Sequence, residues 1–369
     1  MREFDFVISS DLERAANTAR LAGFEPDQRA IWREGDLGAW EGRTFAEVRD
    51  TYGDELRRLN DGEDVKMGGT GESPFEVSGR ALEGVGEVLA ELEDGRTALV
   101  VTHGGLISGL MRRILSVPNR GRRLGIPANT SFTRLTFDVV DGSDVVLVDS
   151  FNDAAHLGPV TDWTQGHLAE GFPVIDFIRH GQTDANVARR FQGHADWGLN
   201  DVGRSQADRV APHLGSFDAV YTSSLGRAHE TADAMFSEPV TRTDALREID
   251  MGEWNGLLLD EVPRDDYYKR LFVDFEDVPR GHTGERWSEM AERARTFVIE
   301  TAEARPGQRI GMVSHGGTIR ALIGVTLGLD HRGVRSHLGL LANMAISQAV
   351  IFPTGPMVTS YNVPGHPEG

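Results

Sequence analysis

Short apolar runs alternate along most of the chain with segments whose apolar residues recur at helical spacing. The runs RTALVVT (96–102) and QRIGMVS (308–314) are typical of buried strands, and each leads into His-Gly-Gly and a predicted helix. Helical spacing occurs at Ala81, Val85, Val88, Leu89 and Leu92, and again at Met290, Ala294, Phe297 and Val298. Strands that alternate with amphipathic helices predict an α/β sheet protein.

Four blocks of this pattern occur twice in the same order. DFVISSDLERAANT (5–18) matches DAVYTSSLGRAHET (218–231), and IWREGDLGAWEG (31–42) matches ALREIDMGEWNG (245–256). GESPFEVSGRA (71–81) matches GERWSEMAERA (284–294), and ALVVTHGGLISGLMRRIL (98–115) matches IGMVSHGGTIRALIGVTL (310–327). Corresponding residues stay 212 to 214 positions apart, so the sequence predicts a tandem duplication.

The repeat sets the expected domains. A length of 369 residues exceeds what one core usually organises, which also favours two domains. Both copies end in a β-rich stretch, at 130–151 and 344–362, and residues 152–173 show little periodicity. We expect a first domain over 1–157, a linker over 158–172 and a second domain over 173–369.

Composition narrows the classes of function. The net charge of −19 argues against a general nucleic-acid surface, which needs clustered Lys and Arg. The sequence lacks a long apolar run and a secretory leader, so it predicts no membrane association. Because cysteine is absent, disulfides, thiolate metal sites and a cysteine nucleophile are excluded. We expect a cytoplasmic protein that holds any phosphorylated ligand through local cations.

The second copy collects residues that suit phosphate chemistry. A predicted strand delivers Arg179 and His180 to its carboxyl end, Arg227 begins a helix, and His315 follows another strand beside a helix N-terminus. Helix N-termini favour anions, and Arg donates paired hydrogen bonds to phosphate. Glu248 lies on a loop between these elements. The set predicts a phosphate pocket that contains one carboxylic acid.

The motifs RHGQTDAN, TSSLGRAHET, LREIDMGEWNG and SHGG, taken in this order, resemble the histidine phosphatase superfamily, also called phosphoglycerate-mutase-like. The resemblance covers about 174–362 in the second copy and about 5–156 in the first. It implies two three-layer α/β/α domains with mostly parallel central sheets, the first incomplete at its N-terminus. It also implies that no metal or other cofactor is needed.

The resemblance assigns a role to each residue of the second copy. His180 would be the nucleophile that forms a phosphohistidine, and Glu248 would protonate the leaving alcohol and then activate water. Arg179, Arg227 and His315 would hold the phosphoryl oxygens. Positions that line the phosphate or substrate would be Gly181, Asn186, Gln192, Gly193 and Gly316. The partner would be a small phosphorylated metabolite, and homo-oligomer formation stays open.

Two reactions remain open at this stage, phosphomonoester hydrolysis and mutase-type transfer. Only 135 positions separate His180 from His315, which is closer to the phosphatase branches of the family that the sequence resembles. The segment after Trp254 is mostly acidic and has one adjacent pair of cations, Lys269 and Arg270, whereas a mutase must hold a bisphosphorylated intermediate. Hydrolysis is therefore the favoured prediction.

The first copy keeps Arg14, Glu34 and His103 but has no counterpart of VIDFIRHGQTDANVARRFQGH (174–194). It therefore cannot form a phosphohistidine. Either the natural protein starts upstream, which is the favoured interpretation, or the first copy is degenerate and covers the gap left by a central strand.

Functions other than catalysis also stay open for the first copy. It could still bind a phospholigand or serve as a scaffold, and a buried Arg14 without a partner would require an anion beside it. Several residues of both copies receive a purely structural interpretation: Trp40 and Trp254 as packing residues, and His194, His213, His229, His282, His331 and His337.

Overall fold

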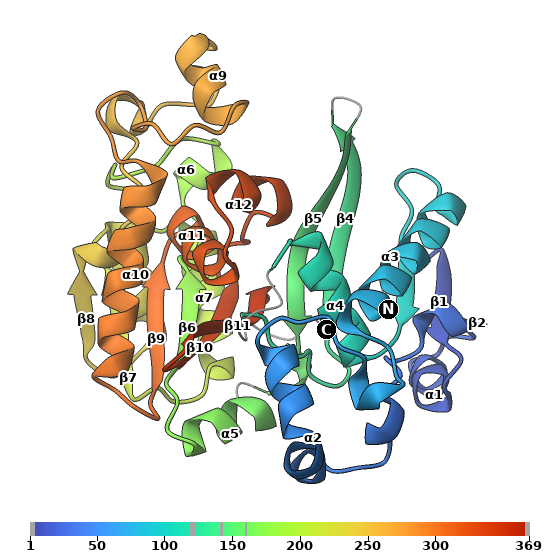
Figure 1. The fold of residues 1–369 in the computed structure, drawn as a ribbon. Helices are drawn as coiled ribbons and strands as arrows, with labels where there is room; N and C mark the ends of the chain where they lie inside the picture. Colours follow the sequence, from blue (N-terminus) through green and yellow to red (C-terminus); the bar gives the residue numbers. More distant parts are fainter. Residues whose placement is uncertain (1–3, 118–122, 141–142, 159–160, 366–369) are drawn as a thin grey trace. The chain divides into compact units, whose positions relative to one another are not determined.

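The computed structural model describes residues 4–117, 123–140, 143–158 and 161–365, and these form two compact units, 1–130 and 131–369 (Figure 1). The first unit contains β1 (Phe6–Ser10), α1 (Glu13–Leu21), β2 (Asp27–Arg29), α2 (Phe45–Asn60), α3 (Pro74–Glu91), β3 (Ala98–Val101) and α4 (Gly104–Ile114). Its three strands form a parallel sheet in the order β2-β1-β3.

The second unit begins with β4 (Phe132–Val140), β5 (Ser143–Asp153), α5 (Asp162–Ala169), β6 (Val174–Arg179), α6 (Asp184–Val187), α7 (Asp201–Val210), β7 (Ala219–Ser223), α8 (Gly226–Met235) and β8 (Val240–Thr243). It continues with α9 (Asp266–Phe272), α10 (Trp287–Glu303), β9 (Arg309–Ser314), α11 (Gly316–Leu327), α12 (His331–His337), β10 (Ile346–Phe352) and β11 (Gly355–Val363). Short 3₁₀ turns lie between several of these elements.

The sheet of the second unit is mixed and has the order β4-β5-β11-β10-β6-β9-β7-β8. Strands β6, β9, β7 and β8 run parallel, and β10 joins β6 antiparallel. Helices α7 and α8 pack on β6 and β9 through a core that includes Ile178, Val210, Ala232 and Val313. Figure 1 shows α10 and α11 in front of the same strands. The α/β prediction is confirmed, with one purely parallel and one mixed sheet.

The predicted helical periodicity marks buried faces. In α3, Ala81, Val85 and Val88 are buried, whereas Leu89 is still 37% exposed. In α10, Met290, Ala294 and Val298 are buried. Helix α3 begins with a capping box in which the Ser73 hydroxyl accepts from the backbone N–H of Glu76 and the Glu76 carboxylate accepts from that of Ser73. Reciprocal bonds of this kind fix where a helix starts.

The compact units divide elsewhere than at the expected boundary after residue 157. The hairpin β4–β5, expected to close the first domain, lies in the sheet of the second unit, where Phe151 pairs with Tyr361 of β11. The Asn362 side chain also donates to the carbonyl oxygen of Asp149 at 2.6 Å. Pairing between strands that are far apart in the sequence therefore places the hairpin in the second unit, although it follows the blocks of the first copy in the chain.

The segment 158–172, expected to be a linker, is partly helical. Residues 162–169 form α5, which the Thr161 hydroxyl caps by accepting from the backbone N–H of Thr164. Thr164 is buried and its hydroxyl donates to the side chain of Gln348 in β10. The helix is thus packed onto the sheet of the second unit, while residues 159–160 lie outside the described part.

Strand β3 has one paired edge among the described residues. It pairs with β1, and all four of its residues are half-buried. The strand that matches it in sequence, β9, is buried along its whole length because β6 and β7 flank it. The first unit therefore shows an open edge where the second has the strand that carries His180.

Candidate active site

The carboxyl end of β6 places His180 in the interior of the second unit. Its backbone N–H donates to Ser314 at the end of β9, and its side chain is only 2% exposed. The ring Nδ1–H donates to the carbonyl oxygen of Gly181 at 2.7 Å, which leaves Nε2 with the lone pair. Burial, with Arg227 and Arg179 nearby, holds the pKa of His180 well below its ordinary value, so the ring is neutral at neutral pH.

Two arginines flank this imidazole. The Arg227 side chain is 1% exposed, and its Nη2 and Nη1 donate to the carbonyl oxygens of Gly193 (2.8 Å) and Ala195 (3.2 Å). Arg179 donates through Nη1 to the carbonyl oxygen of Leu341. Burial lowers the pKa of both arginines, to about 10 for Arg227. Both remain cationic and are held by neutral carbonyl groups, which leaves their charge uncompensated by a direct ion pair.

His315 faces His180 across the site, with 5.2 Å between the ring centroids. The Ser223 hydroxyl accepts from the backbone N–H of Leu225 and lies 2.8 Å from Nε2 of His315. Three buried nitrogens, Arg179 Nε, Arg227 Nε and His315 Nδ1, have no hydrogen-bond partner among the described residues. Because unpaired buried donors are costly, these atoms indicate a place for an anion.

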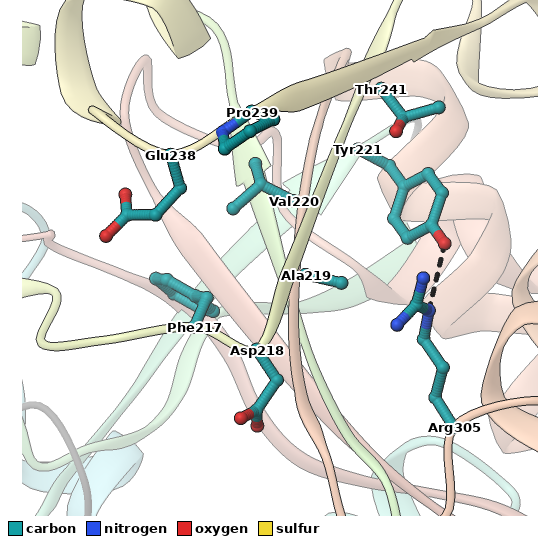
Figure 2. A pocket seen from close by; sticks show the side chains of 9 residues that line it. All are labelled: Phe217, Asp218, Ala219, Val220, Tyr221, Glu238, Pro239, Thr241 and Arg305. Atoms are coloured by element: carbon teal, nitrogen blue, oxygen red, sulfur yellow. Dashed lines mark hydrogen bonds between the residues drawn. The ribbon is translucent and has the colours of Figure 1, made fainter.

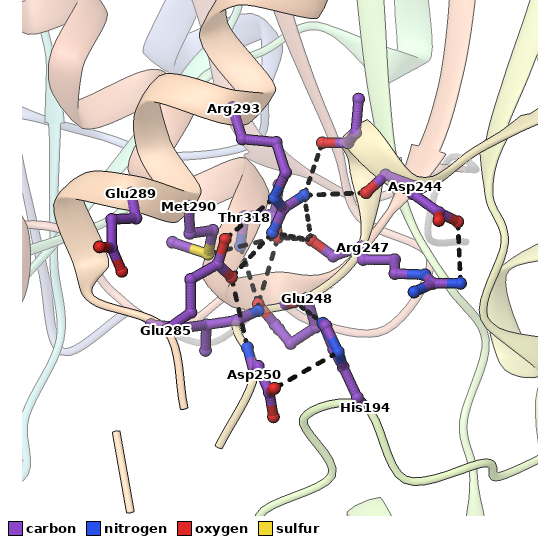
Figure 3. A network of polar contacts seen from close by, with 12 residues as sticks. His194, Asp244, Arg247, Glu248, Asp250, Glu285, Glu289, Met290, Arg293 and Thr318 are labelled. Carbon is purple, nitrogen blue, oxygen red and sulfur yellow. Dashed lines mark hydrogen bonds and ion pairs between the residues drawn. The ribbon is translucent and has the colours of Figure 1, made fainter. Parts of the chain in front are cut away.

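The carboxylate of Glu248 is anchored on the N-terminus of α11 (Figure 3). Oε2 accepts from the backbone N–H of Gly317 at 2.9 Å, and Oε1 accepts from that of Thr318 at 3.1 Å and of Ile249 at 3.0 Å. A Cβ on Gly317 would come within 2.5 Å of Oε1, so this approach requires glycine. Electrostatic coupling of Glu248 to Arg179 and Arg227 places it at the same site.

The other residues expected to line the site have varied contacts. Gly193 accepts from Arg227, and the Arg179 side chain lies against Gly316. The Thr183 hydroxyl donates to the side-chain oxygens of Asn186 and Gln192, and Thr183 is the N-cap of α6, with Asn186 completing its capping box. The last of these residues, Gly181, donates its N–H to the Thr231 hydroxyl.

Sequence reasoning missed three residues that hold this site. Nε2 of His194, given a purely structural interpretation, lies 2.9 Å from the carbonyl oxygen of Glu248. The Asn343 amide donates to the carbonyl oxygen of His180 at 2.9 Å. Thr231 donates to the carbonyl oxygen of Arg227 and accepts from Gly181. The motif RFQGH already contained His194, whereas Asn343 lies in a loop that carries no recognisable pattern.

The first unit keeps part of the same arrangement. The Glu34 carboxylate accepts from the backbone N–H groups of Gly105 and Leu106 at the start of α4, as Glu248 does at α11. Nε of Arg14, however, donates to Nδ1 of His103 at 3.2 Å, and Arg14 is exposed. An anion would be expected beside Arg14 if this residue were buried without a partner. Arg14 is exposed and bound to His103, so no anion is required there.

One cavity in the second unit lies away from these residues. It has a volume of about 320 Å³ and is lined by Phe217, Asp218, Ala219, Val220, Tyr221, Glu238, Pro239, Thr241 and Arg305 (Figure 2). This lining includes the amino end of β7, whereas Arg179, His180 and His315 lie at the carboxyl ends of their strands. Within the described ranges no cluster of His, Asp and Glu is arranged to hold a metal ion, and no helix is long and apolar enough to cross a membrane.

Comparison with known proteins identifies the family. The model of the histidine phosphatase superfamily (branch 1) matches residues 1–149 and 175–364. The chain belongs to this superfamily. Phosphoglycerate mutase-like protein 4 of Arabidopsis thaliana is 38% identical over 158 residues, 40% of this chain and 68% of the relative. Glucosyl-3-phosphoglycerate phosphatase of Mycobacterium tuberculosis is 34% identical over 165 residues, 41% of this chain and 74% of the relative.

Among solved structures, the chain is similar to a mutant phosphoserine phosphatase from Entamoeba histolytica in complex with phosphoserine. The identity is 27% and the TM-score 0.49, and the match covers 52% of this histidine phosphatase family member and 96% of that chain.

Proposed function

We propose that the second unit is a metal-independent phosphomonoester hydrolase that works through a phosphohistidine on His180. One observation carries the proposal: the neutral ring of His180 lies beside three buried nitrogens, on Arg179, Arg227 and His315, that have no partner among the described residues. Phosphoryl transfer needs an unprotonated nucleophile and donors that are placed in advance around the transferring group.

The first step is attack of His180 Nε2 on phosphorus. The N–P bond forms while the bond to the leaving oxygen breaks, and Glu248 gives that oxygen a proton. Arg179, Arg227 and His315 hold the non-bridging oxygens during the transfer. In the second step water attacks phosphorus, Glu248 takes a proton from the water, and inorganic phosphate leaves as His180 is regenerated.

Mutase-type transfer is the competing reaction, and one relative is a phosphoglycerate mutase-like protein. Hydrolysis is favoured by an ion pair that compensates positive charge in the segment after Trp254. Nε and Nη2 of Arg270 both lie 2.8 Å from the Glu276 carboxylate, so this arginine is neutralised within its own segment. The adjacent pair of cations in this segment therefore offers a second phosphoryl group less positive charge than the sequence suggests.

The first unit is proposed to be another copy of the same fold. Its block order and the two separate matches of the family model support a duplication, and its described residues include no counterpart of the strand that carries His180. Phospholigand binding is less favoured for it, because Arg14 and His103 bind each other.

The test is release of phosphate from p-nitrophenyl phosphate by the chain and by its His180→Ala variant, in the presence of a metal chelator. We expect hydrolysis by the parent and none by the variant. A phosphoenzyme that is labile in acid and stable in alkali would identify the N–P bond. Hydrolysis that persists in the variant would refute the assignment of His180.

A further inference from the structure

The loop that carries Glu248 curls around the guanidinium group of Arg293 from α10 (Figure 3). Nη1 of Arg293 donates to the carbonyl oxygens of Asp244 at 3.0 Å and Ala245 at 2.8 Å. Nη1 and Nη2 both lie 3.3 Å from the carbonyl oxygen of Arg247, the residue immediately before Glu248. One side chain therefore binds three carbonyl groups in the segment just before Glu248, which consists of the short 3₁₀ turn Asp244–Leu246 and Arg247.

The carboxylate of Glu285 fixes the plane of this guanidinium. Nε and Nη2 of Arg293 donate to Oε1 and Oε2 of Glu285 at 3.0 and 2.9 Å. Glu285 also reaches the far side of the loop, since its backbone N–H donates to the carbonyl oxygen of Asp250 at 2.9 Å. The paired hydrogen bonds to the Glu285 carboxylate fix the orientation of the Arg293 guanidinium. Arg293 therefore holds the loop before Glu248, and the backbone of Glu285 holds it after Glu248.

The first unit contains the same device around the loop of Glu34. Nη1 of Arg80 donates to the carbonyl oxygens of Ile31 and Arg33, each at 2.8 Å. Nε and Nη2 of Arg80 donate to the Glu72 carboxylate at 2.8 and 2.7 Å. Arg80 and Arg293 thus hold equivalent loops, although only the second unit contains His180.

We propose that Arg293, oriented by Glu285, is a positioning residue for the proton transfer of Glu248. This inference rests on the proposed function. The side chain of Glu248 is anchored on α11, but its backbone lies on the loop, so the place of the carboxylate relative to the leaving oxygen depends on both attachments. A displacement of about 1 Å of a catalytic group costs as much as 10²-fold in rate.

The experiment compares two substrates that differ in their need for a proton. The p-nitrophenolate leaving group departs without protonation, whereas the alkoxide of an alkyl phosphate such as glycerol phosphate does not. We expect Arg293→Lys to lower kcat/KM for the alkyl phosphate by about 10²-fold and for p-nitrophenyl phosphate by less than about 3-fold. This ratio reports the step in which the leaving group departs, where general acid catalysis by Glu248 contributes only for the alkyl phosphate, and not the later attack of water, which is common to both substrates. Glu285→Gln is the second variant, and it is expected to show the same selectivity with a smaller loss.

Arg80→Lys is the matched control, since it makes the same change in the twin loop of the first unit. It should leave kcat/KM unchanged for both substrates. Equal losses of kcat/KM on both substrates in the Arg293 and Glu285 variants, or no loss on either, would overturn the inference while leaving the proposed function intact. Absence of hydrolysis by the parent chain would instead refute the proposed function.

Discussion

Arg14 donates a hydrogen bond to Nδ1 of His103 in the first unit, whereas Arg227 and His315, which match them in sequence, do not bind each other. Nδ1 of His103 is therefore an acceptor and its Nε2, 2.9 Å from the Ser10 hydroxyl, carries the proton. In the second unit Nδ1 of His315 and Nε of Arg227 have no hydrogen-bond partner among the described residues. The same residue types thus form a hydrogen-bonded pair in one unit and remain apart in the other, as the proposed phosphate site requires.

This difference predicts that replacement of His315 affects activity, whereas replacement of His103 does not. His315→Ala should lower kcat/KM for p-nitrophenyl phosphate by at least about 10²-fold, because a donor aimed at the transferring group is lost. His103→Ala should leave it unchanged. Steady-state kinetics on both variants checks this, and a comparable loss in His103→Ala would show that the first unit takes part in catalysis.

The buried fork of Arg227 should not be replaceable by lysine. Arg227→Lys keeps a positive charge but loses the paired donors and the contacts with the Gly193 and Ala195 carbonyl groups. We expect kcat/KM to fall by about 10²-fold or more, as for removal of one donor to a developing charge. Arg14→Lys is the control and should be silent. Retention of near-parental activity in Arg227→Lys would mean that charge alone suffices at this position.

Gly317 should be essential for the placement of Glu248. A Cβ there would lie 2.5 Å from Glu248 Oε1, so Gly317→Ala must displace the carboxylate from the N-terminus of α11. With an alkyl phosphate such as glycerol phosphate as substrate, the expected result is a loss of kcat with little change in KM, since the phosphate-holding residues remain in place. Gly105→Ala creates the same clash with Glu34, at 2.6 Å, and serves as the control without effect on activity. If the two variants behave alike, Glu248 is not the proton donor.

The lowered pKa of His180 sets the pH dependence. Its ring stays neutral as the pH falls through about 6.5, the ordinary value for histidine, so kcat should show no inflection there from loss of the nucleophile. Stability behaves differently, because the unfolded chain takes up protons on His180 and His315 below that pH while the folded chain does not. The free energy of unfolding should therefore decrease as the pH falls below about 6.5.

Chemical unfolding between pH 8 and pH 5, combined with ring chemical shifts of labelled histidine, measures both effects. His180→Gln should reduce the pH dependence of stability, because it removes one of the histidines whose pKa is lowered by burial. An inflection of kcat near the ordinary imidazole value that is assigned to His180 by its chemical shift would contradict the neutral buried ring.

The ion pair between Arg309 and Asp176 should be the most consequential one for stability. The two side chains are 6% and 2% exposed, and Nη2 of Arg309 lies 2.5 Å from the Asp176 carboxylate. Arg309→Met would leave a buried carboxylate without its cation, at a cost of about 3–5 kcal/mol in the free energy of unfolding. The exposed pair of Arg242 and Asp233 is the control, with an expected cost of less than about 1 kcal/mol. Urea unfolding distinguishes them, and similar costs would indicate that the buried site admits water.

The sequence by itself determined the elements and most of the candidate site. Periodicity marked the buried faces of α3 and α10, and the order of strands and helices was enough to bring Arg179, His180 and His315 together, because the carboxyl ends of parallel strands meet at one edge of a sheet. The paired blocks also made His103 the counterpart of His315. These features are local, because they depend on short-range pattern and on residue type.

The tertiary structure alone decided which parts join. The hairpin β4–β5 ends the first copy in the chain but pairs with β11, because strand pairing depends on edges that approach from far along the sequence. Arg14 binds His103 in the first unit, whereas Arg227 binds the carbonyl groups of Gly193 and Ala195 in the second. The sequence shows which residue types can form a site. The groups that surround each residue in the tertiary structure decide whether it binds a ligand or a neighbouring side chain.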